Sequence, residues 1–203
     1  AIYYASLGWQ VFPVQPGKKE PMTHNGFYSA TIDVHQIQQW WIQNPNANIG
    51  VRTGIESNLT VIDIDGKVGL DSYKTIAHEL PKGTRVMKTP HGYHLCFQYN
   101  SEFKQGVDLL EKVDVRNDGG YIVAPPSYVV CDKNNCDKQH IFDYSVYKDL
   151  PTQRILVAPE VFLVRHRNGT TPVPEIEHPT WVSELLANGV EEGQRNQSAT
   201  SLA

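Results

Sequence analysis

Residues 59–66, LTVIDIDG, limit the possible folds more than any other stretch, because a strand-like apolar run ends in two aspartates. Successive side chains of a β-strand point to opposite faces of the sheet. This alternation predicts one face with Thr60, Ile62 and Ile64 and the other with Val61, Asp63 and Asp65. The two carboxylates therefore share a face. Charged groups in a partly buried strand are costly unless a partner compensates them, so this pair indicates a specific role.

Two later segments repeat this design. In residues 93–99, YHLCFQY, the alternation predicts an apolar side with Tyr93, Leu95, Phe97 and Tyr99 and an opposite side with His94, Cys96 and Gln98. In residues 113–116, VDVR, it separates Val113 and Val115 from Asp114 and Arg116. If the three strands are neighbours with their apolar faces packed on helices, the opposite face collects Asp63, Asp65, His94, Asp114 and Arg116.

Such a face has the composition of a metal site with phosphate-binding groups. Nearby carboxylates raise one another's pKa unless a cation neutralises them, and oxygen ligands suit Mg²⁺ or Mn²⁺ rather than zinc. A pair of these ions supports phosphoryl transfer, one by activating the attacking hydroxyl and one by holding the phosphates.

Each residue also has a plain structural interpretation. Asp65 and Gly66 form a common turn dipeptide, and Asp63 alone fits a solvent-facing strand position. A single histidine such as His94 is more often structural than catalytic. Asp114 alone fits a surface pair with Arg116. The combination of these residues favours a functional site.

Composition excludes other classes. The chain has 203 residues, enough for one main domain, with 40% hydrophobic and 20% charged residues, as in soluble globular proteins. No apolar run approaches the roughly 20 residues that span a bilayer, and the N-terminus has neither a basic leader nor a cleavage site, so we expect a trimmed fragment of a non-membrane protein. Three cysteines favour a reducing, cytoplasmic setting. The net charge of −4 requires any nucleic-acid contact to use local basic clusters.

The order of elements is readable along the chain. We expect helices at residues 3–7, 34–44 and 70–79, the second capped by Asp33 and carrying Val34, Ile37, Trp40 and Trp41 on one side. Strands are expected at residues 9–14, 48–52, 59–64, 93–99 and 113–115. Residues 1–171 form the predicted catalytic domain, the proline-rich residues 172–179 a linker, and residues 180–203 the start of a truncated helical domain.

Five segments in order resemble the archaeo-eukaryotic primase superfamily, in particular the bifunctional primase-polymerase domain of plasmids, phages and prophages. They are GWQVFPVQPGKKEP, SATIDVHQIQQWWIQNPNANIGVRTG, LTVIDIDG, KTPHGYHLCF and VDVRNDGGYIVAPPS, within about the first 130 residues. The resemblance implies an α/β (α+β) catalytic core built around an antiparallel sheet like that of RNA-recognition motifs, beside a smaller N-terminal α/β unit. It also implies a DNA primase and DNA polymerase of a mobile-element replication protein.

The resemblance assigns roles by position. Asp63, Asp65 and Asp114 match the acidic motifs and are expected to bind two Mg²⁺ or Mn²⁺ ions, while His94 is expected to contact the phosphates of the incoming NTP or dNTP. The expected nucleotide-binding residues are His94, Arg116, Gly119, Gly120, Lys19 and Thr89. Thr89 is included because Gly92 stands where distant primases often have serine. The expected partners are a single-stranded DNA template with its primer, and a helical and possibly a helicase domain downstream.

Two features of the C-terminal part bear on these expectations. Gly193, Arg195 and Asn196 resemble the G-x-R-N start of the helical domain that follows the catalytic domain in many relatives. Cys131, Cys136 and His140 form a C-x4-C-x3-H pattern that relatives lack. Because a structural zinc needs a fourth ligand and Cys96 is expected on the catalytic face, we predict a polar hairpin tip there and no zinc.

Two other functions remain open. One is a metal-dependent nuclease of the rolling-circle initiator type, but His91 and His94 are spaced for opposite faces of a strand, and none of the ten tyrosines is marked as its nucleophile. The other is a non-catalytic single-stranded DNA-binding module that stacks bases on Trp40, Trp41 and exposed tyrosines. Metal-dependent nucleotide incorporation distinguishes the three functions.

Overall fold

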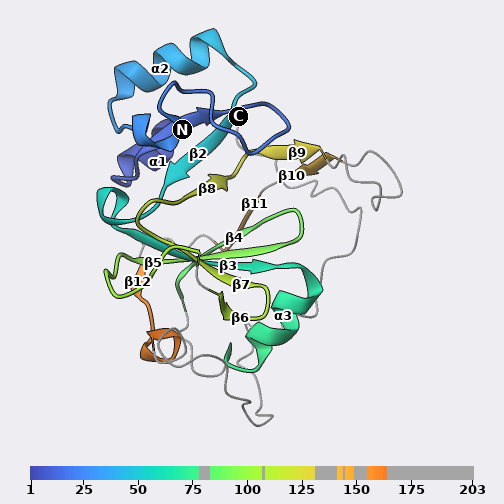
Figure 1. The fold of residues 1–203 in the computed structure, drawn as a ribbon. Helices are drawn as coiled ribbons and strands as arrows, with labels where there is room; N and C mark the ends of the chain where they lie inside the picture. The colour runs from blue at the N-terminus through green and yellow to red at the C-terminus, as the bar shows by residue number, and fades with distance from the viewer. Residues whose placement is uncertain (78–82, 107, 131–140, 144, 149–154, 164–203) are drawn as a thin grey trace.

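The computed structural model describes residues 1–77, 83–106, 108–130, 141–143, 145–148 and 155–163. Two layers are visible in Figure 1, a small unit with α1, α2, β1, β2 and β8 and a larger sheet with α3 on its far side. The α-helices are α1 (Ile2–Ser6), α2 (Val34–Gln43) and α3 (Gly66–Lys74), and short 3-10 helices are η1 (Gly26–Ser29) and η2 (Ile55–Ser57). No helix in these ranges is long and apolar enough to cross a membrane.

The strands are mostly short. They are β1 (Val11–Val14), β2 (Asn48–Arg52), β3 (Leu59–Asp65), β4 (Arg85–Lys88), β5 (Gly92–Gln98), β6 (Asp108–Leu110), β7 (Val113–Arg116), β8 (Tyr121–Ala124), β9 (Tyr128–Val130), β10 (Ile141–Asp143), β11 (Ser145–Lys148) and β12 (Leu156–Val157). The five strands expected from the sequence all form, each within two residues of its predicted ends.

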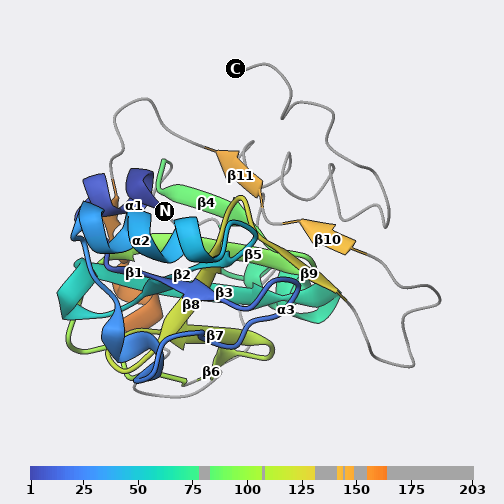
Figure 2. The same ribbon diagram turned by 90° about the horizontal axis from the view of Figure 1, so that it is seen from above.

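The larger sheet has the order β11-β4-β5-β3-β7-β6, with β12 added in parallel to β5. All its other neighbours are antiparallel, and β3 lies in the middle between β5 and β7. The three strands with the alternating pattern are therefore adjacent, as predicted. Figure 2 shows the small unit lying across this sheet when seen from above.

One face of the larger sheet carries the main hydrophobic core, and it is the face that the alternation predicts. Its buried residues from β3, β5 and β7 are Ile62, Ile64, Tyr93, Leu95, Phe97, Val113 and Val115. Leu70 and Tyr73 of α3 and Phe162 near the end of the described chain pack against them. Burying this apolar surface stabilises the sheet by roughly 25 cal/mol per Å² removed from water, an upper estimate.

The small unit is a three-stranded sheet with the order β1-β2-β8, flanked by helices. Its helix α2 begins as predicted, because the Asp33 side chain accepts hydrogen bonds from the backbone N–H groups of His35 and Gln36. A Cβ at Gly50 would lie 2.3 Å from the ring of Phe12, so only glycine lets that ring cross β2. Strand β8 comes from late in the chain, so this N-terminal unit is completed by residues that follow the catalytic strands.

The other face of the larger sheet is divided, which differs from the expectation of one continuous polar face. Val61 and Cys96 are fully buried there against Val51, Ile122 and other residues of the small unit. Cys96 is on the same face as His94, as the alternation predicts, but it lies under this second core and not in the catalytic part. The polar part is the remainder, toward the α3 end of β3.

Three local expectations were wrong. Helix α3 begins at Gly66 and not at Leu70, because Gly66 has a φ of +65° and turns the chain directly from β3 into the helix. Tyr99 lies beyond the end of β5, and its hydroxyl donates to Asp118 at 2.7 Å instead of joining the core. Val34 is 45% exposed, so it is not part of the buried side of α2. The cysteine-histidine pattern at 131–140 and residues 172–203 lie outside the described residues.

Candidate active site

Three of the predicted residues form a row across three adjacent strands. Asp63 on β3 is paired in register with His94 on β5 and with Asp114 on β7. Because directly paired residues project to the same face, their side chains meet. The Nε2 of His94 lies 3.4 Å from Oδ1 of Asp63. His94 is buried, while Asp63 and Asp114 are partly exposed.

Arg116 connects the two carboxylates. Its Nε and a terminal guanidinium nitrogen donate to Oδ2 of Asp63 at 3.2 and 2.9 Å. The same terminal nitrogen donates to Oδ2 of Asp114 at 3.2 Å. The guanidinium therefore occupies the space between the carboxylates and supplies the positive charge that the sequence analysis assigned to metal ions.

The carboxylates have opposite electrostatic environments. Burial alone would raise the pKa of Asp63, but His94 and Arg116 outweigh burial and hold this pKa well below the ordinary value. Asp114 is less well compensated, because burial and a hydrogen bond with Asp108 raise its pKa to about 6 despite the nearby Arg116. The charge crowding expected from the sequence is therefore concentrated at Asp114.

Asp108 is a site residue that the sequence analysis missed. It is exposed on β6 and paired in register with Asp114 on β7. The signal that indicates it is DLLEKVDVR, in which two short, largely apolar segments are separated by only two residues, as in a hairpin. Its carboxylate adds a fourth oxygen donor group to this edge of the face.

We expect the substitution Asp114→Asn to increase stability at neutral and higher pH. A carboxyl whose pKa is raised on folding contributes stability below its unfolded pKa of 3.8 and loses that contribution as pH rises through its folded pKa of about 6. Asparagine carries no charge and avoids this loss. The free energy of unfolding at pH 8 should therefore rise by roughly 1 kcal/mol, a value that allows for solvent screening. The measurement is urea unfolding with EDTA at pH 4 and pH 8, and equal effects at both would contradict this assignment.

Asp65 lies two residues from Asp63 on the same face, where β3 ends. It is exposed, it pairs in register with Gly92, and it occupies the N-cap position of α3 without capping it through its side chain. Because α3 begins immediately after it, the Asp65 carboxylate stays at the open edge of the row. This is the position that the sequence predicted.

Thr89 and Gly92 close the hairpin between β4 and β5. The backbone N–H of Gly92 donates to the Thr89 hydroxyl at 2.9 Å, and the N–H of Thr89 donates back to the carbonyl of Gly92. A Cβ at Gly92 would lie 1.8 Å from the carbonyl oxygen of Ile64, so a serine cannot be placed there without moving β3. The Thr89 hydroxyl thus has a structural partner in the hairpin.

Of the remaining predicted residues, Gly119 and Gly120 lie where β7 passes into β8, and Lys19 lies in the loop after β1. Gly119 has a φ of +79°, and a Cβ at Gly120 would lie 2.1 Å from the side-chain oxygen of Gln105, which accepts a hydrogen bond from the backbone N–H of Asn117. Lys19 is exposed, and its carbonyl accepts a hydrogen bond from the hydroxyl of Tyr121 at 3.0 Å.

Asn117 holds this junction in place and was not singled out from the sequence. It is completely buried, and its side-chain amide donates to the carbonyls of Asn100 and Phe103 at 2.9 and 2.8 Å. Its side-chain oxygen accepts from the Thr60 hydroxyl at 3.1 Å. By fixing the end of β7 on both sides, Asn117 positions the neighbouring Arg116.

The residues fit divalent metal ions in donor chemistry. Asp63, Asp65, Asp114 and Asp108 provide only oxygen ligands, which Mg²⁺ and Mn²⁺ prefer. Among the residues that the structure describes, no three acidic, histidine or cysteine side chains are arranged as a ready metal cluster. Arg116 bridges two of these carboxylates.

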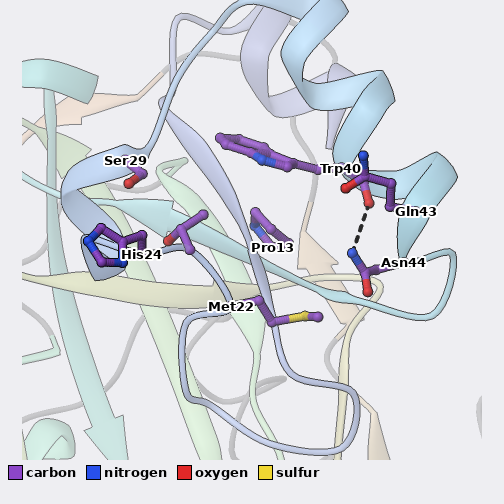
Figure 3. A pocket seen from close by; sticks show the side chains of 8 residues that line it. Pro13, Met22, His24, Ser29, Trp40, Gln43 and Asn44 are labelled. Atoms are coloured by element: carbon purple, nitrogen blue, oxygen red, sulfur yellow. Dashed lines mark hydrogen bonds between the residues drawn. The ribbon is translucent and has the colours of Figure 1, made fainter.

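Two cavities are hollowed into the small unit, away from the carboxylates. One of about 310 Å³ lies between α2 and the loop before η1, where Trp40, His24 and Asn44 face it (Figure 3). The other, of about 690 Å³, lies between α1 and α2. Neither is lined by a residue predicted to act in catalysis.

A central antiparallel sheet with carboxylates on its middle strand, joined to a small α/β unit, defines a primase-like α/β domain. No curated protein matches the chain. The model of the family "Bifunctional DNA primase/polymerase, N-terminal" matches residues 1–159, and the chain belongs to this family. Membership implies DNA primase or polymerase activity, and it confirms the resemblance and the fold class inferred from the sequence.

Proposed function

We propose that this domain extends a primer along a single-stranded DNA template by nucleotidyl transfer that depends on two divalent ions. The observation that carries the proposal is the register of β3, which places Asp63 directly between His94 and Asp114. The ions, when bound, activate the primer 3′-hydroxyl and offset the charge that develops on the phosphates. The resemblance described above is to the primase-polymerase domains of plasmids, phages and prophages. We therefore also propose that this chain comes from the replication protein of a mobile element.

The residues of the chain divide this work. Asp63, Asp65 and Asp114 are the proposed metal ligands, with Asp65 nearest to solvent. His94 is buried beside Asp63 with its Nε2 toward the carboxylate, so it holds that carboxylate in place. Its proposed contact with the nucleotide phosphates is carried over from the family resemblance. Deprotonated Asp114 is required for ion binding, and its raised pKa makes this binding weaker in mildly acidic solution.

Arg116 has two proposed roles that it cannot perform at the same time. In the described structure its guanidinium neutralises Asp63 and Asp114. If bound divalent ions neutralised these carboxylates instead, the guanidinium would be free to contact the triphosphate, for which its forked donors are well suited. We therefore expect metal and nucleotide to bind cooperatively. Metal ions would displace Arg116 from the carboxylates, and a bound triphosphate would hold Arg116 away from them.

The nucleotide-binding assignment is tested with His94→Ala and Arg116→Ala. Each should weaken binding of a nucleoside triphosphate in the presence of Mn²⁺ by about 1.5–3 kcal/mol, the scale of a charge-assisted hydrogen bond. Isothermal calorimetry measures this, with Lys74→Ala as control, since Lys74 pairs with the exposed Asp71 on α3. Wild-type affinity in both variants would contradict the assignment.

Arg116→Ala also has an opposite expected effect on ion binding alone. Because the variant loses the cation that occupies the carboxylates, Mn²⁺ without nucleotide should bind it more tightly than the wild type, by roughly a factor of ten for one charge-assisted contact. Titration of Mn²⁺ followed by electron paramagnetic resonance measures the free ion directly.

The function as a whole is tested by primer extension with labelled nucleotides and either Mg²⁺ or Mn²⁺. Incorporation that depends on a template and on either metal supports the proposal. The nuclease alternative predicts a covalent DNA adduct instead. The structure offers it little support, because His91 is exposed before β5 begins whereas His94 is buried within the strand.

A further inference from the structure

Tyr28 is an aromatic side chain held at the surface of the small unit. It lies on η1 (Gly26–Ser29) and is 63% exposed, more than any other aromatic residue whose side chain is described. The guanidinium of Arg52 lies over its ring, 5.3 Å from the ring centroid. The arginine, at the end of β2, is itself held by an ion pair with Glu56 on η2. One face of the ring is thus covered by a cation, while the side chain as a whole stays largely accessible.

A series of aromatic rings connects Tyr28 with the catalytic side. Phe27 lies against Tyr28 with ring centroids 4.3 Å apart, and it stacks on Tyr121 at 5.5 Å and 29° between planes. Tyr121 is also paired in register with Arg52. Tyr121 is the first residue of β8, and its hydroxyl donates to the carbonyl of Lys19 at 3.0 Å. The segment that leads into it begins directly after Arg116, the last residue of β7.

The charges around this surface identify its kind of ligand. Arg52 is paired with Glu56, and Glu20 follows the exposed Lys18 and Lys19 in the sequence. These five charges leave an excess of one positive charge, which does not make the patch a strongly basic phosphate site. A ring backed by a guanidinium instead offers a flat, polarised face. Bases of single-stranded nucleic acid stack on such faces with little dependence on sequence.

We propose that Tyr28, supported by Arg52 and Phe27, is a stacking subsite for a base of the single-stranded template strand. The inference rests on the proposed function, since a template is needed only if the domain copies DNA. The aromatic series joins Tyr28 to Tyr121, at the start of the strand that follows β7 and its Arg116. A template base held there would be kept unpaired before it reaches the nucleotide site.

The test is the affinity of the protein for fluorescein-labelled oligo-dT, measured by anisotropy with EDTA and no nucleotide. Tyr28→Ala should bind roughly five- to 150-fold more weakly, the loss that follows from removing one stacking partner. Tyr28→Trp should restore binding. The control Ile42→Ala removes a 70% exposed apolar residue of α2 and should bind as the wild type does.

An oligonucleotide with abasic positions separates stacking from charge. The wild type should prefer oligo-dT over the abasic oligomer, whereas Tyr28→Ala should bind the two alike. Two results would overturn the proposal: unchanged oligo-dT affinity in Tyr28→Ala, or an equal preference for oligo-dT over the abasic oligomer in the wild type and Tyr28→Ala. Either result would favour a protein partner for this surface. Because no catalysis is measured, inactivity of the domain in primer extension is a separate result that refutes the proposed function alone.

Discussion

Replacing Asp63 by asparagine should reduce metal-dependent primer extension by a factor on the order of a hundred to a thousand. Asp63 is the proposed metal ligand at the centre of the row, and a divalent ion contributes several kcal/mol of charge stabilisation in the transition state. The same loss is expected for Asp65→Asn. Extension rates of the wild type and both variants, measured at saturating Mn²⁺, check this prediction.

Stability distinguishes the two variants. Asp63 accepts hydrogen bonds from Arg116, so Asp63→Asn should lower the free energy of unfolding by about 1.5–3 kcal/mol. Its pKa is lowered on folding, so this contribution is present above the unfolded pKa of 3.8 and disappears as pH falls below it. Asp65 is exposed and does not cap α3, so Asp65→Asn should leave stability within about 0.5 kcal/mol of the wild type.

A matched control is Asp71→Asn on the exposed side of α3, where the carboxylate pairs with Lys74. It removes the same charge a few residues away and should retain full activity. Activity of Asp65→Asn close to that of Asp71→Asn would mean that Asp65 is not a metal ligand, since its folding effect is negligible.

Gly92→Ala should cause the largest loss of stability among these substitutions. The added Cβ would lie 1.8 Å from the carbonyl oxygen of Ile64, and the clash involves backbone that cannot rotate away. Strands β3 and β5 must separate at this point, at a cost of about 3 kcal/mol or more. Tm should then fall by roughly 6–12 °C for a chain of this size.

The same substitution should also reduce activity. Gly92 and its partner Asp65 are each two residues from the paired His94 and Asp63, so separating the strands there displaces the catalytic row. The control is Gly106→Ala. A Cβ at Gly106 would meet no atom within 4 Å, so the only cost of this substitution is the strain of an alanine at a φ of +71°. That strain is about 1–2 kcal/mol. A smaller fall in Tm for Gly92→Ala than for Gly106→Ala would show that the backbone accommodates the methyl group.

The sequence alone determined which side of each strand is apolar. Alternation in β3, β5 and β7 predicted the buried face with Ile62, Leu95 and Val115, and it predicted that Asp63, His94 and Asp114 share the other face. The cap of α2 at Asp33 was predicted in the same way. These properties follow from the chain geometry within a few residues, so they are visible without knowledge of the rest of the fold.

Only the tertiary structure decided what those faces meet. Three contacts depend on segments that are not adjacent in sequence: Arg116 bridges Asp63 and Asp114, Asp108 joins them, and Arg52 lies over the ring of Tyr28. The burial of Cys96 depends on the small unit, which itself needs β8 from late in the chain. Residues far apart in sequence meet according to the register and layering of whole sheets. That arrangement is set by the summed packing of the core, and no short stretch of sequence contains it.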